Sequence, residues 1–423
     1  MTKTSQEPYV CPIAHSRPQE RFNPLAPDFH RAPQASFLAA QAEQPVFFSP
    51  VLNMWVVTRH DDLKAVLQDT DTFRSEGAFY APATVSPAAL EVLGGLDHPV
   101  FRYSLVNTDP PAHTRFRRNF QRAFTPRQVA LLEPQIRALI HDLLAELRQN
   151  KRAEVVKTLC DRLPLLTICR LMGIDDRDAP QIKRWSTDFI RLQIPGSSVE
   201  EQRAIGQSVL DYYMFMRRLV ERYTAEAADN LVRGVIIARQ SDPEPLDDQE
   251  IASLCVGMVL AGHETTAAWL GNALQSLLNE RSRWEYLCQH PGRITLALDE
   301  LMRHAGPAIG LFRRTSRDVV VRGVGIPGGA TVFVPYLGAN HDPAQFPEPE
   351  QLRLERDNAH SHLGFGHGSH YCIGAPLARL EVRLALEELT RHHPSLRLAP
   401  DQAVRPVQNF MLRANEEMIL LID

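Results

Sequence analysis

The sequence has no excess of positive charge. Its 423 residues include 46 Lys and Arg against 50 Asp and Glu, and the formal net charge is −4 at pH 7. Proteins that bind nucleic acid through its phosphates usually carry a basic field, and this chain as a whole offers none. Arginines can still cluster at particular sites, but we expect no nucleic-acid partner.

The cysteines also lack any paired spacing. A disulfide framework typically shows closely spaced pairs in a short secreted chain, whereas the six cysteines of this long chain are scattered. The scattered cysteines favour a reducing compartment, the cytoplasm. They are Cys11, Cys160, Cys169, Cys255, Cys288 and Cys372.

Long apolar runs are missing as well. Residues 1–35 are polar and rich in proline, and no apolar stretch preceded by positive charge indicates a secretory signal. No run approaches the roughly 20 apolar residues that span a bilayer. We expect a soluble protein with no membrane partner. Its prolines predict an irregular arm without helix over residues 1–35, followed by one domain over residues 36–423.

One glycine-rich stretch near the C-terminal end differs from the rest of the chain. Gly364, Gly366 and Gly368 exclude a regular helix or strand, and Pro376 then stands where the first turn of a helix favours proline. We therefore expect Cys372 in a tight loop at a helix N-terminus. Free N–H groups and the helix dipole lower a thiol pKa there. A loop that presents one thiolate is what a thiolate-ligated haem iron needs.

Two other interpretations of this loop are open on the residues alone. A single cysteine is by default a buried, inert thiol. A zinc site could also use His367, His370 and Cys372, although structural zinc usually takes four ligands, commonly in two spaced pairs. No second pair of Cys or His is apparent in the sequence.

The stretch that surrounds Cys372 resembles the haem-ligand signature of the cytochromes P-450, Phe-Gly-x-Gly-x-His-x-Cys-x-Gly, with six fixed positions in ten. The resemblance covers residues 36–423 and implies a haem-thiolate monooxygenase. It implies a mainly α, triangular fold with a small β region. Haem b would lie between a long central helix and the helix after Cys372. Cys372 would be the axial iron ligand, and Phe365 and Gly366 would contact the cofactor.

A long apolar helix is predicted from the acidic start at residues 247–250 to about Leu278. Three residue types inside this predicted helix are unfavourable for a buried helix. Gly262 costs about 1 kcal/mol relative to alanine, a threonine hydroxyl can bond back to a carbonyl four residues earlier, and a buried Glu264 needs a partner. Such exceptions indicate a functional site, and the alternative is a helix kink with a satisfied carboxylate.

The same segment resembles the family's oxygen-groove motif. The resemblance implies that Ala261 and Gly262 line a groove over the haem. It implies that Thr265 hydrogen-bonds dioxygen and that Glu264 feeds protons through ordered water. Both residues are thus expected to be catalytic, and their presence favours dioxygen activation with supplied electrons.

Basic residues in three segments match the family's propionate-binding positions. His113 and Arg117 are four apart and share a helix face, which alone is most often just solvated. The resemblance implies that they bind haem propionates together with Arg313 and His370. An arginine suits this task because its planar fork binds a carboxylate through two hydrogen bonds.

Another motif is expected to be structural. Glu300 and Arg303 share a helix face, and alone such a pair is worth only a few tenths of a kcal/mol. The resemblance implies a buried Glu-x-x-Arg pair joined by Arg356, which supports the fold around the cofactor.

Substrate contacts are predicted in three separate segments. Residues 75–108 are the least periodic part of the chain, and a long loop is either functional or a mobile surface feature. Residues 306–311 and 407–411 also match positions that line the substrate pocket in the resembled family. The expected pocket residues are Phe79, Tyr80, Ile309, Leu311, Phe410 and Met411.

Together these motifs predict an enzyme that uses dioxygen to hydroxylate or dealkylate a small, largely apolar substrate. Electrons would come from NAD(P)H through a ferredoxin and its reductase. The chain also looks similar to the haem domain of self-sufficient members with a fused reductase, so it is either a stand-alone protein or an excised domain. The alternatives are a biosynthetic catalyst of oxidative coupling or desaturation, and a non-enzymatic haem or zinc binding protein.

Overall fold

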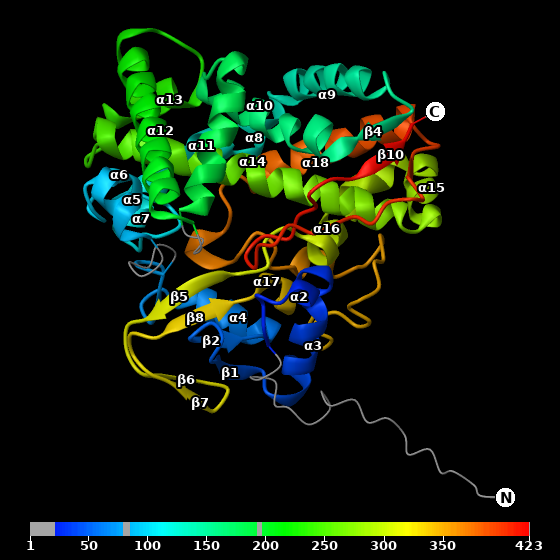
Figure 1. Cartoon of the computed structure of the whole chain (residues 1–423), viewed down its shortest axis with the longest axis horizontal. Helices are drawn as coiled ribbons and strands as arrows, with labels where there is room; N and C mark the ends of the chain where they lie inside the picture. Colours follow the sequence, from blue (N-terminus) through cyan, green and yellow to red (C-terminus); the bar gives the residue numbers. More distant parts are fainter. Residues whose placement is uncertain (1–21, 79–84, 193–196, 423) are drawn as a thin grey trace, which may run out of the picture.

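Helices make up most of the structure. The computed structural model describes residues 22–78, 85–192 and 197–422, and Figure 1 shows long helices beside a smaller region that holds the main sheet. This arrangement confirms the expected mainly α fold with a small β region. The α-helices are α2 (Pro27–Arg31), α3 (Pro33–Glu43), α4 (His60–Gln68), α5 (Pro87–Leu93), α6 (Pro99–Arg102), α7 (Ala112–Gln121), α8 (Pro126–Ala130), α9 (Glu133–Leu147), α10 (Arg162–Met172), α11 (Ala179–Arg191), α12 (Val199–Ala225), α13 (Leu231–Arg239), α14 (Asp248–Leu278), α15 (Arg281–Gln289), α16 (Ile294–Ala305), α17 (Tyr336–Asn340) and α18 (Ala375–His392).

The strands form three small sheets within the described residues. The main sheet has the order β1-β2-β8-β5-β3, and the others are β4-β10-β9 and β6-β7. Strands β2 and β8 pair in parallel, which joins the N-terminal part of the chain to its C-terminal half. The strands are β1 (Val46–Ser49), β2 (Met54–Val57), β3 (Phe73–Arg74), β4 (Arg152–Glu154), β5 (Leu311–Thr315), β6 (Val319–Val321), β7 (Val324–Ile326), β8 (Thr331–Val334), β9 (Arg397–Leu398) and β10 (Ile419–Leu421).

The main sheet is buried on both faces. Side chains alternate between the faces along each strand. Val57 and Val332 therefore belong to one apolar cluster, which includes residues of α4, and Val56 and Phe333 belong to another, which includes Phe37 of α3. The largest cluster lies among the helices, and in it α14 packs against α10, α12, α16 and α18.

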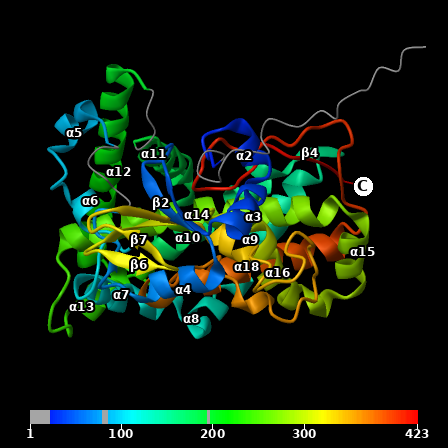
Figure 2. The same cartoon turned by 90° about the horizontal axis from the view of Figure 1, so that it is seen from below.

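Helix α14 runs through the middle of the helical part (Figures 1 and 2). It begins as the sequence predicts. The Asp247 side chain accepts hydrogen bonds from N–H groups of the first turn, and the Asp247 N–H donates to the Glu250 carboxylate. Its length and composition would suffice to cross a membrane, which corrects the expectation that no run comes near that length. However, 67% of that apolar window is buried inside the protein, as in a core helix.

The prediction of an irregular N-terminal arm is wrong where the structure describes it. Pro27 and Pro33 stand in the first turns of α2 and α3, where proline is tolerated because its missing N–H has no partner there. Phe22 is buried and its ring lies 5.5 Å from that of Phe37. Residues 22–35 are thus packed against the domain, and residues 1–21 lie outside the described part.

The segment at residues 75–108 is also more regular than expected. It contains α5, capped by the Ser86 hydroxyl, and α6, and helix α5 packs against α12. Residues 79–84 lie outside the described residues. The aperiodic sequence hid two short helices because each is too short to show a helical period.

Glu300, Arg303 and Arg356 form the buried cluster that the sequence predicts. Arg303 Nε and Nη2 each donate to Glu300 at 2.7 Å, and Arg356 Nε donates to the same carboxylate at 3.1 Å. Arg303 and Glu300 are fully buried. Arg303 also donates to the carbonyls of Asn340 and Pro349, so the cluster ties α16 to the end of α17 and to the segment after it.

Removing one member of this cluster is expected to destabilise the protein strongly. Arg303→Ala removes two of the five hydrogen bonds that the buried Glu300 carboxylate accepts, and we expect the free energy of unfolding in urea to fall by about 3–5 kcal/mol. The matched control is Arg31→Ala, which removes an exposed pair with Asp28 and should change stability by less than about 1 kcal/mol. Equal losses for both variants would contradict a structural role of the cluster.

Candidate active site

Cys372 lies in a loop that two glycines shape. Gly366 and Gly368 have φ values of 72° and 71°, which strain any other residue. A Cβ on Gly368 would also lie 2.6 Å from the Leu67 carbonyl oxygen. The Cys372 N–H donates to the Phe365 carbonyl at 2.9 Å and closes the loop, and α18 begins three residues later. The predicted loop before a helix N-terminus is confirmed.

The protein alone does not make the Cys372 thiol acidic. Burial raises its pKa, and this effect outweighs the N–H groups of Gly374 and Ala375 and the charge of Arg117, which lower it. The expectation of a lowered pKa is therefore wrong for the free thiol. Because a metal ion deprotonates a coordinating thiol outright, a thiolate here fits a metal-bound state.

Phe365 is held by residues that the sequence did not single out. Its ring makes an edge contact with Trp269 of α14 at 5.8 Å, and the Arg379 guanidinium lies 4.4 Å above it. Arg379 of α18 also pairs with Asp299 of α16 at 3.0 Å. These contacts fix the Cys372 loop to three helices.

The middle of helix α14 is more exposed than the turns on either side of it; we call residues 261–265 its open stretch. Ala261 is exposed and Gly262 and Thr265 are half-buried, although the flanking turns of this helix are buried. Thr265 Oγ1 donates to the Ala261 carbonyl at 2.8 Å, as expected. A Cβ on Gly262 would lie 3.2 Å from Ile168 of α10, so this glycine also permits close helix packing.

Glu264 lies close to a lysine and a histidine. Its Oε1 lies 3.0 Å from Lys183 Nζ of α11 and 3.2 Å from His263 Nε2. Burial opposes the charge of Glu264, but His263 and Lys183 outweigh it and lower the pKa to about 2. Lys183 lies 3.7 Å from Asp161 as well. Sequence reasoning missed Lys183 because it stands 81 residues away from Glu264, in a helix with no motif.

His113, Arg117, Arg313 and His370 gather at one place. The rings of His113 and His370 lie 4.1 Å apart, and His370 Nε2 lies 3.1 Å from Ser75 Oγ. Burial and the neighbouring arginines lower the pKa of His113 to about 4. Burial, His113 and these arginines lower that of His370 to about 3. The structure therefore brings all four predicted propionate partners together.

The two arginines of this group have no acid to balance them. Arg313 of β5 is 2% exposed, its Nη1 donates to the Phe312 carbonyl, and its Nε has no partner within the described residues. Arg117 makes no ion pair with any described acid, and burial lowers its pKa. Buried cations require an anion nearby. The carboxylates of a haem fit this need, and the nearby Cys372 sulfur fits its iron.

The zinc interpretation of the loop finds no support. Within the described part of the chain, His367, His370 and Cys372 do not form a group with metal-ligand spacing. His367 Nε2 instead lies 2.9 Å from the Gln68 amide nitrogen, and His370 packs on His113.

Three predicted pocket residues, Ile309, Phe410 and Met411, belong to one apolar cluster in the structure, whereas Leu311 packs against the other cluster of the sheet. The Ile309 N–H donates to the Met411 carbonyl at 2.9 Å, and Leu311 follows on β5. Ile309 is buried in the apolar cluster of the sheet, and Phe410 packs against Phe312 and Phe333. Phe79 and Tyr80 lie outside the described residues, so their role stays a prediction.

Comparison with known proteins agrees with this geometry. A model of the cytochrome P-450 family matches residues 294–421. The mycinamicin IV hydroxylase/epoxidase of Micromonospora griseorubida is 32% identical over 368 residues, which cover 86% of this chain and 88% of that protein. The chain belongs to the cytochrome P-450 family. It is a haem-dependent monooxygenase, and this sets aside the non-enzymatic alternatives.

Solved structures show the same fold. The cytochrome P-450 named CREJ, in complex with (4-ethylphenyl) dihydrogen phosphate, is 34% identical with a TM-score of 0.89, and the match covers 96% of this chain and 100% of that chain. An intact type IV self-sufficient cytochrome P-450 monooxygenase is 31% identical with a TM-score of 0.89. That match covers 96% of this chain but 53% of the other. As a member of this family, the protein works with a substrate, dioxygen and a redox partner.

The contact between Glu264 and Lys183 predicts a pH-dependent stability. The Glu264 pKa falls from 4.5 to about 2 on folding, so the carboxylate stabilises the folded protein above pH 4.5 and this contribution is lost as the pH falls toward 2. We expect Lys183→Met to raise this pKa and to lower the unfolding free energy by about 1–3 kcal/mol at pH 7.

The comparison is made by urea unfolding at pH 7 and at pH 3. The deficit of Lys183→Met should shrink at pH 3, where the carboxylate is partly protonated in the variant. The control is Lys157→Met, which changes an exposed lysine that forms no ion pair with a described acid. A deficit that does not depend on pH would show that Lys183 acts by packing alone.

Proposed function

We propose that this monooxygenase hydroxylates a small, largely apolar organic molecule, and that Cys372 would bind the iron of haem b. One observation carries the assignment of the site. The half-buried Cys372 thiol lies near the half-buried Arg117 and the buried Arg313, which pair with no described acid, and residues that flank the open stretch of α14 belong to the apolar cluster against which Cys372 packs.

The residues divide into those that hold the cofactor and those that manage protons. When bound, haem b supplies redox chemistry and dioxygen activation, which the thiolate ligand promotes by donating electron density. His113, Arg117, Arg313 and His370 would neutralise its carboxylates. Phe365, Gly366, Ala261 and Gly262 would contact the bound cofactor.

Glu264 and Thr265 would deliver protons on the α14 side. Glu264 stands between the half-exposed Lys183 and the open stretch of the helix, so its carboxylate can exchange protons with solvent on one side. The Thr265 hydroxyl, which donates to Ala261 in this structure, can turn to donate into the open space. Relaying a proton at these two oxygens is the task we assign to them.

Electrons would come from NAD(P)H through a ferredoxin and its reductase. A surface hollow of about 640 Å³ beside α7 and the Cys372 loop is lined by Arg117, Arg118 and Arg122. Such a basic hollow suits an acidic electron carrier. A fused reductase is the alternative, which the likeness to the self-sufficient structure supports. The cytoplasmic location is part of the proposal, and the five described cysteines, all free, support it.

The substrate class follows from the apolar neighbours of the pocket segments. Ile309, Leu311, Phe410 and Met411 offer aliphatic and aromatic contacts. The related structure in complex with (4-ethylphenyl) dihydrogen phosphate supports a small organic substrate. Oxidative coupling or desaturation on the same haem is the second candidate, and product analysis distinguishes the two.

Replacing the proposed iron ligand tests the site. We expect Cys372→Ser to remove the red-shifted Soret band of the reduced carbon-monoxide complex, because that band requires a thiolate ligand. Cys288→Ser, at a half-buried cysteine of α15, is the matched control and should keep the band. A band that survives in Cys372→Ser would refute the ligand assignment.

Replacing Thr265 tests the proton relay. In Thr265→Ala we expect the product formed per NAD(P)H consumed to fall roughly tenfold or more, with peroxide released instead, because the proton donor is lost. Thr265→Ser keeps a hydroxyl and should restore most of the coupling, and Thr266→Ala changes the neighbouring threonine as a control. Unchanged coupling in Thr265→Ala would remove this residue from the mechanism.

A further inference from the structure

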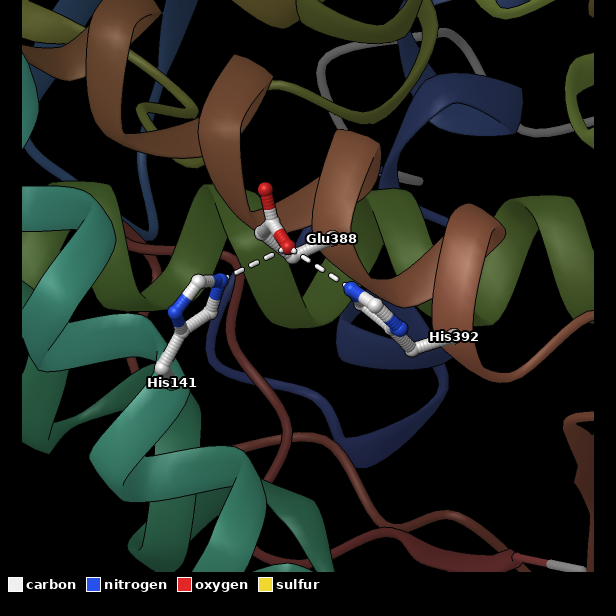
Figure 3. A group of neighbouring side chains, drawn as sticks. All are labelled: His141, Glu388 and His392. Atoms are coloured by element: carbon white, nitrogen blue, oxygen red, sulfur yellow. Dashed lines mark hydrogen bonds and ion pairs between the residues drawn. The ribbon is translucent and has the colours of Figure 1, made fainter.

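Two imidazoles and one carboxylate meet between helices α9 and α18. His141 comes from α9, while Glu388 and His392 stand four residues apart on one face of α18. In Figure 3 the two rings lie on either side of Glu388 and point toward it. Glu388 lies 13 residues after Ala375, about 20 Å along the helix, so the group is separate from the Cys372 loop.

The three ligand atoms have the spacing of a small metal site. His141 Nε2 lies 2.9 Å and His392 Nε2 lies 3.2 Å from the same oxygen, Glu388 Oε2, and all three atoms are within 4.8 Å of one another. Zinc binds nitrogen and oxygen at 2.0–2.2 Å, and its tetrahedral neighbours are therefore roughly 3.3–3.5 Å apart. Small side-chain rotations place a cation among these atoms, with water as a fourth ligand.

The carboxylate is already oriented for this task. Glu388 has a side chain that is 1% exposed, and its other oxygen, Oε1, accepts a hydrogen bond from Arg137. Such a bond to the second oxygen is what typically orients a ligating carboxylate. Arg391 lies 3.6 Å from Oε1 as well, so Oε2 faces the two rings.

The surrounding charges do not repel a dication. Three arginines and three glutamates form a connected network here, so its formal charges cancel. They are Arg137, Arg383, Arg391, Glu133, Glu387 and Glu388.

Both rings are accessible and free to change tautomer. The side chains of His141 and His392 are 54% and 42% exposed, so an ion can enter from solvent. Neither Nδ1 has a hydrogen-bond partner among the described contacts. Each ring can therefore carry its proton on Nδ1 toward water while Nε2 binds the metal.

We propose that His141, Glu388 and His392 bind one Zn²⁺ ion, which bridges α9 and α18. Two imidazoles and a carboxylate suit a borderline divalent ion, whereas Mg²⁺ and Ca²⁺ prefer oxygen ligands. The ion would cross-link α9 to the helix whose N-terminus follows the Cys372 loop.

Metal analysis tests this proposal. The tag-free holoenzyme is treated with EDTA, dialysed against buffered Zn²⁺ and analysed by mass spectrometry for zinc per chain. We expect one bound zinc in the unmodified protein and at least tenfold weaker binding in His141→Ala and His392→Ala. His360→Ala, at an exposed histidine outside the group, is the matched control and should keep the zinc.

Equal zinc content in all these proteins would overturn the proposal. The carbon-monoxide spectrum of each variant confirms that it is folded. Should His141→Ala fail to fold, His141→Gln is used in its place. Anomalous scattering at the zinc edge from crystals of the unmodified protein gives an independent result. A peak within bonding distance of the three ligands supports the site, and a peak elsewhere or no peak contradicts it.

Discussion

The whole site depends on compensating two arginines without acid partners, the buried Arg313 and the half-buried Arg117. Arg117 and Arg313 lie beside two imidazoles whose pKa values are far below normal, and no described acid pairs with either arginine. A protein does not maintain such a cluster without an anion. The thiol of Cys372 has the complementary need for a cation, since burial raises its pKa. In the proposed arrangement, the carboxylates and the iron of a bound haem would meet these two needs.

On the α14 side of the site the buried charge is negative. The charge belongs to Glu264, which Lys183 and His263 stabilise. Lys183 is partly exposed, which would connect this carboxylate to solvent in the proposed relay, and the Thr265 hydroxyl donates to the Ala261 carbonyl. The proposed cofactor edge thus carries arginines without acid partners, whereas the carboxylate of the proposed proton path is paired with a lysine.

Helix α18 links several of these features. The Cys372 loop leads into its N-terminus, Arg379 in its second turn supports Phe365, and its last turns carry Glu388 and His392. Its packing against α9, α14 and α16 fixes the loop relative to the rest of the core. A metal ion at the far end would act on the same rigid element, so its effect would be on stability more than on chemistry.

Local features could be predicted from the sequence: the glycine loop at Cys372, the capped start of α14, the back-bonded Thr265 and the Glu300–Arg303 pair. Each depends on residues close in sequence, so spacing and backbone conformation are enough to predict it. The surroundings of these features became known only from the folded structure. Burial raised the Cys372 pKa, Lys183 reached Glu264 from another helix, and Pro27 and Pro33 began helices instead of breaking them. Burial and long-range pairing depend on how distant segments pack, and no local pattern records that packing.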